Sequence, residues 1–524
     1  MRSLLPEKYH YYVYIFALVL LVVGLPLSKF LMSLSQIILA VNWLLEGNLK
    51  SKFKFFFKNK PALILSSLLL LHFVGLLWTS DFGYAASDIR IKAPLFVLPL
   101  ILCTSKPLTR KSFDMVLQLF VVAIIIASAI STLILSDVIH REVVDIRKIS
   151  IFISHIRFSL LICMAVFISG FYFMKAAAGW KRIAWSLVIA WLLIFLALME
   201  SLTGIMTLGF CVFILCIYQI THSENKWLKI GGPVFLLCSL VVVFLYIRGI
   251  AKEALVQPRL DVSSLERVTA KGNRYSQSMV NMQSENGNYV WVNYNMDEME
   301  ESWNKRSEIK FLERDLKSNE IRFTLVRFLA SKGWKKDGEA VEKLSAEEIN
   351  AIQRGVVNVK FQNVSSLRGR IHEVCWEIDQ YRKNGIPNGH SITQRFEYWK
   401  TAGRIIRDNF LIGVGTGDVQ KAFEEQYEKD HSRLLKEWRL RAHNQYLTFA
   451  VTFGIFGFLL FVWTLIFPVI RKKVRTNYLY ICFFLIAVVS FLTEDTLETQ
   501  AGVTFFAFFN SFLLFVQPDL RKRR

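Results

Sequence analysis

RAHNQYL, residues 441–447, marks the boundary between a long hydrophilic region and a long apolar one. The nearly two hundred residues before it are hydrophilic, and residues 447–467 are apolar and long enough to cross a bilayer, which takes about 20 residues. His443, with Arg441 and Asn444 close to it, is therefore predicted at a membrane surface or just inside it. Titratable groups are costly there and usually serve a function, so we interpret the rest of the chain as arranged around this point.

The composition indicates a polytopic membrane protein. Of the 524 residues 53% are hydrophobic and the mean hydropathy is +0.36, whereas soluble proteins contain about 45–50% apolar residues. Of the seven cysteines only Cys375 lies outside an apolar run, so a disulfide framework is not expected. The first apolar run, residues 11–32, is long and leads into further spans, so no cleavable signal peptide is expected.

About 12 apolar runs are candidates for membrane-spanning helices, two of them short. They lie at residues 11–31, 33–47, 61–79, 93–104, 114–135, 151–174, 183–199, 202–220, 230–248, 443–469, 476–493 and 500–517.

The segments between these runs alternate in basic charge. Lysine and arginine cluster at residues 50–60, 106–111, 175–182, 226–229, 471–475 and 521–524. The opposite short loops hold only Lys29, Arg90, Lys92, Arg141, Arg147 and Lys148. By the positive-inside rule the first set is cytoplasmic, which places both termini in the cytoplasm. The net charge of +21, from 63 basic and 42 acidic residues, is therefore largely topogenic and gives no evidence for a nucleic-acid partner.

The same rule places residues 249–442, here called the inserted domain, on the outer side of the membrane, the periplasm in a Gram-negative cell. We therefore expect an all-α polytopic membrane protein in three parts. Residues 1–248 form an N-terminal bundle of about nine transmembrane helices. The inserted domain is long enough for a core of its own and is mainly helical. Residues 443–524 form about three transmembrane helices and a basic cytoplasmic tail.

Local patterns predict the elements of the inserted domain. The turn signal at residues 286–288 predicts a hairpin or loop rather than a helix over residues 273–302. A capping box at residues 345–348 predicts a short helix to Gln353. Further helices are predicted at residues 367–383, at residues 392–409 with an amphipathic pattern, and at residues 419–441 with a high charge.

His443 is the first candidate for chemistry. It is either a general base or an orienter of an acceptor hydroxyl, because imidazole titrates near neutrality. The alternative is a helix-start histidine satisfied by Asn444 or by a carbonyl. Arg439 and Arg441 would favour the neutral, proton-accepting imidazole.

Arg395 is the second candidate, near the start of the amphipathic helix. A guanidinium binds phosphate in a bidentate way, so Arg395 could clamp a phosphate group. The alternative is an ion pair with Glu397 or Asp379. The glycine-rich turn at residues 413–417 is not interpreted as a phosphate-binding loop, because no strand precedes it and no Lys-Ser/Thr follows. It is predicted to be a helix C-terminal cap.

Other charged residues lie near the outer ends of the spans. Arg157 lies near the outer end of the sixth span, a turn or two inside it, where it either faces a buried anion or extends to the interface. Glu494, Asp495 and Glu498 lie in the last outer loop, where they could steer a sugar, balance the arginines or be solvated. No HExxH, paired CxxC or outward-facing DxD pattern is found, so we expect no metal and no cofactor.

The C-terminal motifs resemble the O-antigen ligase/polymerase superfamily of bacterial envelope glycosyltransferases. They are Arg395-x-x-x-Trp399-x-x-Ala402, then Gly413-Val414-Gly415-x-Gly417, then Ala442-His443-Asn444-x-Tyr446-Leu447 with Gly454 and Gly457. The layout is similar to that of the ligase branch, with about a dozen spans and one large periplasmic loop before the third-last helix.

The resemblance implies a GT-C-like transferase of the bacterial inner membrane. It would move a glycan from a polyprenyl-diphosphate carrier to an acceptor hydroxyl, in ligases on the lipid A core, without metal or ATP. His443 would activate or position the acceptor, and Arg395 would bind the leaving diphosphate. Arg157, Arg441, Asn444 and Glu494 would bind the diphosphate or sugar.

Two departures from the family pattern leave the assignment open. The Ser-Arg-Gly motif near a middle span is replaced by Ser201-Leu-Thr-Gly204, and Arg157 is the candidate for the missing arginine. Residues 250–390 are not explained by the family pattern. An O-antigen polymerase or a protein O-oligosaccharyltransferase would share the motifs. Outside the family, a lipid-linked glycan flippase or a binding factor without chemistry are alternatives, although a flippase would need more charges within its spans.

Overall fold

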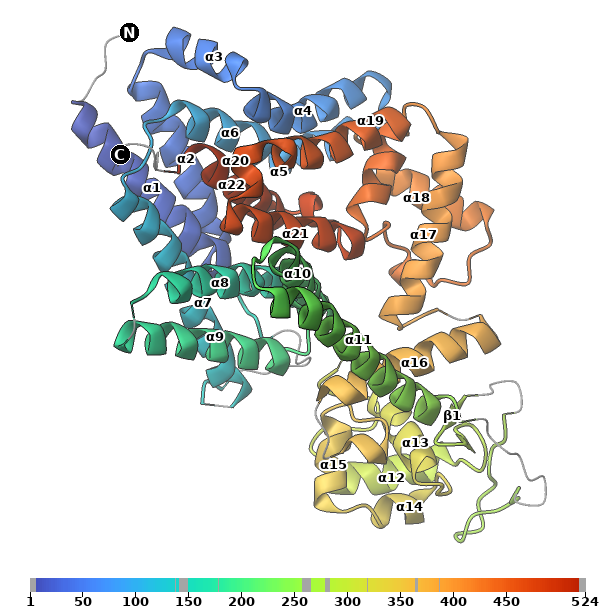
Figure 1. Ribbon diagram of the computed structural model, residues 1–524. Helices are drawn as coiled ribbons and strands as arrows, with labels where there is room; N and C mark the ends of the chain where they lie inside the picture. Colours follow the sequence, from blue (N-terminus) through green and yellow to red (C-terminus); the bar gives the residue numbers. More distant parts are fainter. Residues whose placement is uncertain are drawn as a thin grey trace.

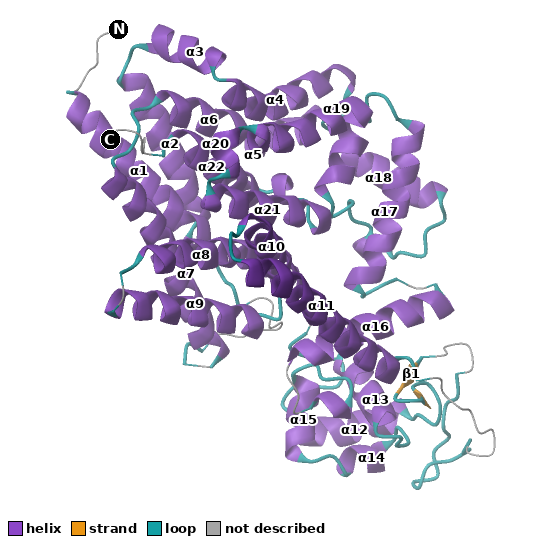
Figure 2. Cartoon of the chain, viewed as in Figure 1, coloured by secondary structure: helices purple, strands orange, loops and turns teal. Residues whose placement is uncertain are grey.

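The computed structural model describes residues 6–136, 138–140, 149–177, 179–256, 265–278, 283–317, 319–362, 366–385 and 387–517. The predicted basic tail at residues 521–524 and the loop residues Arg141, Arg147 and Lys148 lie outside this part of the chain. The described chain is almost entirely helical (Figure 1), and its one small sheet has two strands (Figure 2). It is an all-α membrane protein, as the composition predicts.

Eight helices in the described chain are long and apolar enough to cross a membrane. They are α1 (Glu7–Leu27), α4 (Lys60–Val74) with its continuation η1 (Gly75–Trp78), α7 (Arg110–Leu135), α8 (His155–Lys175), α9 (Trp180–Leu198), α10 (Leu202–His222), α11 (Lys226–Ala254) and α19 (Gln445–Ile470).

Shorter apolar helices account for the remaining predicted runs. The pair α2 (Lys29–Leu45) and α3 (Leu49–Lys58) bends by 114° and gives a ninth span if it is counted as one. The others are α6 (Pro94–Thr104), α21 (Tyr478–Thr493) and α22 (Gln500–Phe515), and short α5 (Phe82–Lys92), α20 (Lys472–Arg475) and η6 (Thr496–Glu498) connect the spans. The count of 12 spans and their orientation stay predictions.

The centre of the bundle is α22, which packs against α6, α21, α1 and α2. Its residues 501–513 are all buried, and its phenylalanines stack on neighbouring helices, for example Phe512 on Phe113 at 4.8 Å between ring centroids. A helix enclosed by protein on every side can be apolar all round without contacting lipid. This explains why a helix of only 16 residues holds the bundle together.

The inserted domain is connected to the bundle by α11, which runs from the bundle to that domain in Figure 1. Its 29 residues span about 43 Å, well beyond a hydrocarbon core of about 30 Å. Its last turns pack on α16 (Ser366–Asn384), where Arg368 pairs with Glu253 at 2.8 Å. The inserted domain therefore begins at the end of a helix that projects from the bundle.

The remaining elements of the inserted domain form a hairpin and a set of short helices. They are β1 (Ser284–Glu285), β2 (Asn288–Tyr289), α12 (Met296–Arg306), α13 (Ile321–Ser331), α14 (Gly338–Glu342), α15 (Ala346–Gln353), η4 (Val359–Phe361), α17 (Ser391–Asp408), α18 (Val419–Lys429) and η5 (Lys436–Trp438). The predicted hairpin forms around Asn286 and Gly287, both at positive φ, and the predicted capping box opens α15.

Two predicted boundaries in this domain are wrong. Residues 296–302, expected in a loop, begin α12, because Asn295 caps its first turn through the Glu298 N–H at 3.0 Å. The charged helix expected to reach residue 441 ends at Lys429, because His431 adopts a left-handed backbone at φ +46°. Such a backbone ends a helix, which composition alone does not reveal.

Candidate functional site

The site is built around a break in α19. Gly454 has φ +62° and ψ −159°, and the backbone of residues 410–415 supplies the hydrogen bonds that the helix loses there. Ile455 N donates to the Phe410 carbonyl at 2.8 Å, and Gly415 N donates to the Thr452 carbonyl at 2.9 Å. Irregular backbone at membrane depth is tolerated where protein covers it. The glycine-rich turn therefore fastens α17 and α18 to α19.

Close backbone contact is the reason for glycine in this turn. A Cβ on Gly413 would lie 2.4 Å from the Thr452 carbonyl group, and Gly413 itself has φ +69°. The predicted role as a helix cap is therefore incomplete, because the turn also pairs with a second helix. Asp418 extends the attachment, since its carboxylate accepts the Ser80 N–H at 2.6 Å and the Asp81 N–H at 3.1 Å.

His443 is held in place through its backbone. Its φ is +46°, and its N–H donates to Asp495 Oδ2 at 3.0 Å. The other oxygen of Asp495 accepts the Asn444 N–H at 3.1 Å and the Thr448 hydroxyl at 2.6 Å. Asn444 caps α19, because its side chain accepts the Leu447 N–H at 3.1 Å. One buried carboxylate thus fixes the turn from which the imidazole projects.

The imidazole of His443 has no hydrogen-bond partner among the described residues. Its Nδ1 lies 3.9 Å from Glu494 Oε2, too far for a hydrogen bond, and its ring lies beside Tyr398 with 5.8 Å between ring centroids. The alternative of a histidine satisfied by Asn444 therefore finds no support. Burial lowers the pKa of His443, and the charges of Arg395 and Arg441 lower it further against the opposing Asp495 carboxylate. A neutral imidazole is a proton acceptor at neutral pH.

Arg395 pairs with the loop after α21. Its Nη2 donates to Glu494 Oε1 at 2.8 Å and to the Thr493 carbonyl at 3.3 Å. The partners predicted as alternatives are engaged elsewhere, because Glu397 accepts the Tyr381 hydroxyl and Asp379 pairs with Lys383. The buried Nε of Arg395 has no acceptor in the described chain.

Glu494 lies between these two candidate residues. Burial and the Asp495 carboxylate raise its pKa to about 6, although the positive charge of Arg395 opposes the shift. Arg157, in the first turn of α8, also acts electrostatically on Glu494, and its own Nη1 donates to the Ser154 hydroxyl at 3.0 Å. The buried Arg157 Nε has no acceptor among the described residues. Glu494 is thus paired with Arg395 and lies in the electrostatic field of Arg157, and each guanidinium keeps one unused donor.

Arg441 belongs to an adjoining network of buried charges. Its Nη1 donates to Tyr84 Oη at 2.8 Å and to Glu498 Oε2 at 3.2 Å. Lys92, only 1% exposed, donates to the same Glu498 oxygen at 2.8 Å and also pairs with Asp88. Arg439, expected beside His443, instead pairs with Glu428. Arg441 thus ties the His443 turn to α5.

The structure brings His443, Arg395 and Glu494 together, with Arg157 near enough to act on them electrostatically, while Asn444 and Arg441 support the turn behind them. The sequence does not assign roles to Asp495 as the anchor of the turn or to Lys92 in the buried network. The available signal is three carboxylates in the short loop between two apolar helices. Buried acids need partners: Glu494 pairs with Arg395 and Glu498 with Lys92 and Arg441, whereas Asp495 accepts backbone N–H groups and a hydroxyl.

The arrangement suits an anion and a hydroxyl at the same point. Guanidinium groups with free N–H donors bind a phosphate group, and a neutral imidazole accepts a proton from a hydroxyl. Among the described residues no group of three or more His, Cys, Asp or Glu is placed to hold a metal ion. The expected independence of metal and cofactor stays a prediction.

Comparison with known proteins identifies the segment that carries this site. The family model described as O-antigen ligase matches residues 347–462, which include Arg395, the glycine-rich turn and His443. Members of that family are membrane glycosyltransferase-like enzymes. The resemblance noted in the sequence is confirmed over this segment, and no curated protein matches the chain.

Proposed function

We propose that this chain is a glycosyltransferase of the ligase type, and the match of the O-antigen ligase family model to residues 347–462 supports the proposal. It takes a glycan from a polyprenyl-diphosphate carrier and joins it to an acceptor hydroxyl, on the lipid A core, at the outer face of the bacterial inner membrane. The reaction uses neither metal nor ATP.

One observation carries the proposal: His443 and Arg395 lie on either side of Glu494, at the start of an apolar helix. The His443 Nδ1 is 3.9 Å and the Arg395 Nη2 is 2.8 Å from its two oxygens. A base for the acceptor and a cation for the leaving group are thus held close together. Their position beside the spans suits a donor whose lipid tail stays in the membrane.

The chemistry follows from these positions. The acceptor oxygen attacks the anomeric carbon as His443 takes the hydroxyl proton, and the bond from that carbon to the diphosphate oxygen breaks. The polyprenyl diphosphate leaves with the bonding electrons. Arg395 and Arg157 stabilise its developing charge, and their unused Nε–H groups are the donors available for it. Fixed donors in a buried site act more strongly than they would in water.

Other acceptors fit the same donor chemistry. An O-antigen polymerase would offer a hydroxyl of a second carrier-linked glycan, and a protein O-oligosaccharyltransferase would offer a serine or threonine. A lipid-linked glycan flippase would not need His443. The ligase, the polymerase, the protein transferase and the flippase would therefore leave different glycan products in the cell envelope.

The test is the envelope glycolipid profile, by gel and mass spectrometry, of a deletion strain complemented with wild type, His443→Ala or Arg395→Ala. Arg407→Ala is the matched control, because Arg407 lies on the same helix with its side chain 77% exposed. Immunoblots of membranes check that the variants accumulate equally.

If the chain is a ligase, the deletion strain loses long glycan from the lipid A core and accumulates it on the carrier. Only wild type and Arg407→Ala then restore the core-linked glycan. Core bearing a single repeat unit would instead identify a polymerase, and an intact core with unglycosylated protein would identify a protein transferase. Full restoration by His443→Ala and Arg395→Ala would refute the catalytic assignment and leave a transporter or a binding factor.

A further inference from the structure

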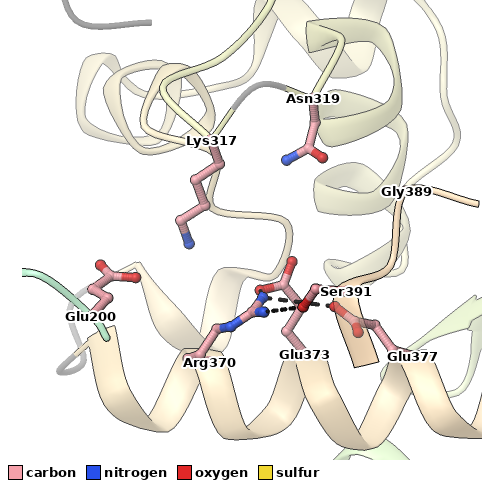
Figure 3. A pocket seen from close by; sticks show the side chains of 8 residues that line it. All are labelled: Glu200, Lys317, Asn319, Arg370, Glu373, Glu377, Gly389 and Ser391. Carbon is pink, nitrogen blue, oxygen red and sulfur yellow. Dashed lines mark hydrogen bonds and ion pairs between the residues drawn. The ribbon is translucent and has the colours of Figure 1, made fainter. Parts of the chain in front are cut away.

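A polar pocket lies where the turn between α9 and α10 meets the inserted domain. Four segments line it. Glu200 comes from that turn, and Lys317 and Asn319 precede α13. Arg370, Glu373 and Glu377 are on α16, Ser391 is the first residue of α17 and Gly389 lies just before it. Figure 3 shows these side chains around a common space. The pocket encloses about 530 Å³, including the part open to solvent.

The spacing along α16 explains the pocket's polar floor. Residues 370, 373 and 377 are three and four apart, so they share one face of the helix. Arg370 Nη1 donates to Glu373 Oε2 at 2.6 Å, and Arg370 Nη2 donates to the Ser391 hydroxyl at 3.1 Å. These two hydrogen bonds fix the Arg370 guanidinium in the floor of the pocket.

Glu377 carries an acceptor that the protein does not use. Glu377 is only 3% exposed, and its Oε2 has no hydrogen-bond partner in the described chain. Its other oxygen lies 3.7 Å from Arg370 Nη1. Burial and the neighbouring Glu373 raise the pKa of Glu377 to about 7. Buried polar atoms are normally hydrogen-bonded, so this oxygen is suited to a ligand that brings a donor.

The charges that line the pocket nearly cancel. Two lining residues are basic, Lys317 and Arg370, and three are acidic: Glu200, Glu373 and Glu377, whose raised pKa leaves it partly neutral at neutral pH. A diphosphate would meet carboxylates, and a cation would meet a guanidinium and an ammonium. A neutral molecule with many hydroxyl groups can donate to the carboxylates and accept from the basic groups and Asn319 at once. The lining therefore favours a neutral sugar.

The pocket adjoins the reactive residues through Ser391. The Ser391 hydroxyl accepts from Arg370, whereas its carbonyl accepts from Arg395 Nη1 at 3.3 Å. Arg395 is four residues along the same helix, a rise of about 6 Å. A sugar chain with its reacting end at Arg395 and His443 can thus reach the pocket with a neighbouring residue.

We propose that this pocket is a subsite for a neutral sugar residue adjacent to the bond that is made or broken. The proposal rests on the proposed function. The sugar belongs either to the donor glycan or to the acceptor glycan, and the same hydroxyl recognition serves both.

The test uses purified full-length protein in nanodiscs, with Glu377→Gln as the variant and Arg382→Ala, an exposed position on the same helix, as the control. Donors with one, two or three sugars on the carrier are paired with a fixed acceptor, and acceptors of one to three sugars with a fixed donor. Thermal unfolding of each variant checks that it is folded.

In wild type and in Arg382→Ala we expect KM to fall as sugars are added to the substrate. In Glu377→Gln we expect KM not to fall with length, so that its KM for the longer substrates is about tenfold above that of wild type. Its KM for the single-sugar substrate and its kcat stay within about twofold. The series affected, donor or acceptor, identifies the source of the sugar. The proposal is overturned if Glu377→Gln leaves KM unchanged in both series, or if it raises KM by the same factor for substrates of every length.

A second measurement separates this proposal from the proposed function. Free oligosaccharides of one to three sugars, released from the host's own envelope polysaccharide, are titrated into wild type and Glu377→Gln by calorimetry. Binding by wild type that weakens about tenfold in the variant supports the subsite even if no transfer is found. Absence of binding by wild type, or equal binding by both proteins, overturns it while leaving the transferase assignment to its own test.

Discussion

Replacing Asp495 with Asn tests how the base is held. The Asp495 carboxylate accepts three hydrogen bonds, from the backbone N–H groups of His443 and Asn444 and from the Thr448 hydroxyl. Asn keeps one carbonyl oxygen and turns an NH2 group toward at least one of these donors. A hydrogen bond to a charged group contributes about 1.5–3 kcal/mol. D495N therefore loses about 2–3 kcal/mol of support for the left-handed turn at His443.

If the transition state needs the imidazole in that position, this loss appears in the rate. We expect kcat/KM for glycan transfer to fall about 30- to 100-fold. Thr448→Val is the matched control, because it removes one neutral donor and leaves both backbone hydrogen bonds, so we expect its loss to stay below about tenfold. Both variants are assayed as purified protein with a carrier-linked donor, alongside thermal unfolding.

The pH profile separates a positioning role from general damage. Burial lowers the pKa of His443, and the charge of Asp495 opposes that shift. In D495N the opposing charge is gone, so the pKa of His443 falls further. A base acts when it is neutral, so the acid limb of kcat/KM against pH moves to lower pH in D495N. A rate within twofold of wild type with an unmoved acid limb would refute this account of Asp495.

Two further substitutions test the frame around the site. Gly413→Ala puts a Cβ 2.4 Å from the Thr452 carbonyl group at a φ of +69°, so we expect it to destabilise the protein by about 1–3 kcal/mol and to lower its Tm. The control, Gly403→Ala, adds a methyl group in open space on α17 and should keep or raise the Tm. Equal Tm values for the two variants would contradict the paired turn. Lys92→Met removes the cation that Asp88 and Glu498 share and leaves Glu498 with Arg441 alone, so we expect the free energy of unfolding to fall by about 3–5 kcal/mol; wild-type stability would show that the network is dispensable.

Local patterns predict much of this molecule. Apolar runs locate every span candidate, because each run must satisfy its own backbone within lipid and does so as a helix. The capping box at Ser345 and the turn at Asn286-Gly287 need only neighbouring residues, and both form as predicted. The joint role of His443 and Arg395 comes from the family resemblance, because the two residues lie on different segments and no local pattern brings them together.

Contacts between distant segments are outside the reach of such patterns. The partner of Arg395 is Glu494, 99 residues away, although Glu397 lies two residues from it. The break at Gly454 is stabilised by residues 410–415, and no local signal shows which backbone will supply those hydrogen bonds. The burial of Lys92 likewise depends on Glu498, from a loop four hundred residues later. These pairings come from topology, which one sequence does not specify.

The break in α19 also constrains how the chain is assembled in the membrane. A continuous helix enters lipid with all its backbone groups satisfied, but one broken at Gly454 does not. The groups exposed at the break are satisfied only after the glycine-rich turn, which is synthesised before α19, has docked on them. Membrane insertion of α19 and folding of the segment before it are therefore one event. A nascent chain that ends at residue 470 already carries both the break at Gly454 and its partners at residues 410–415.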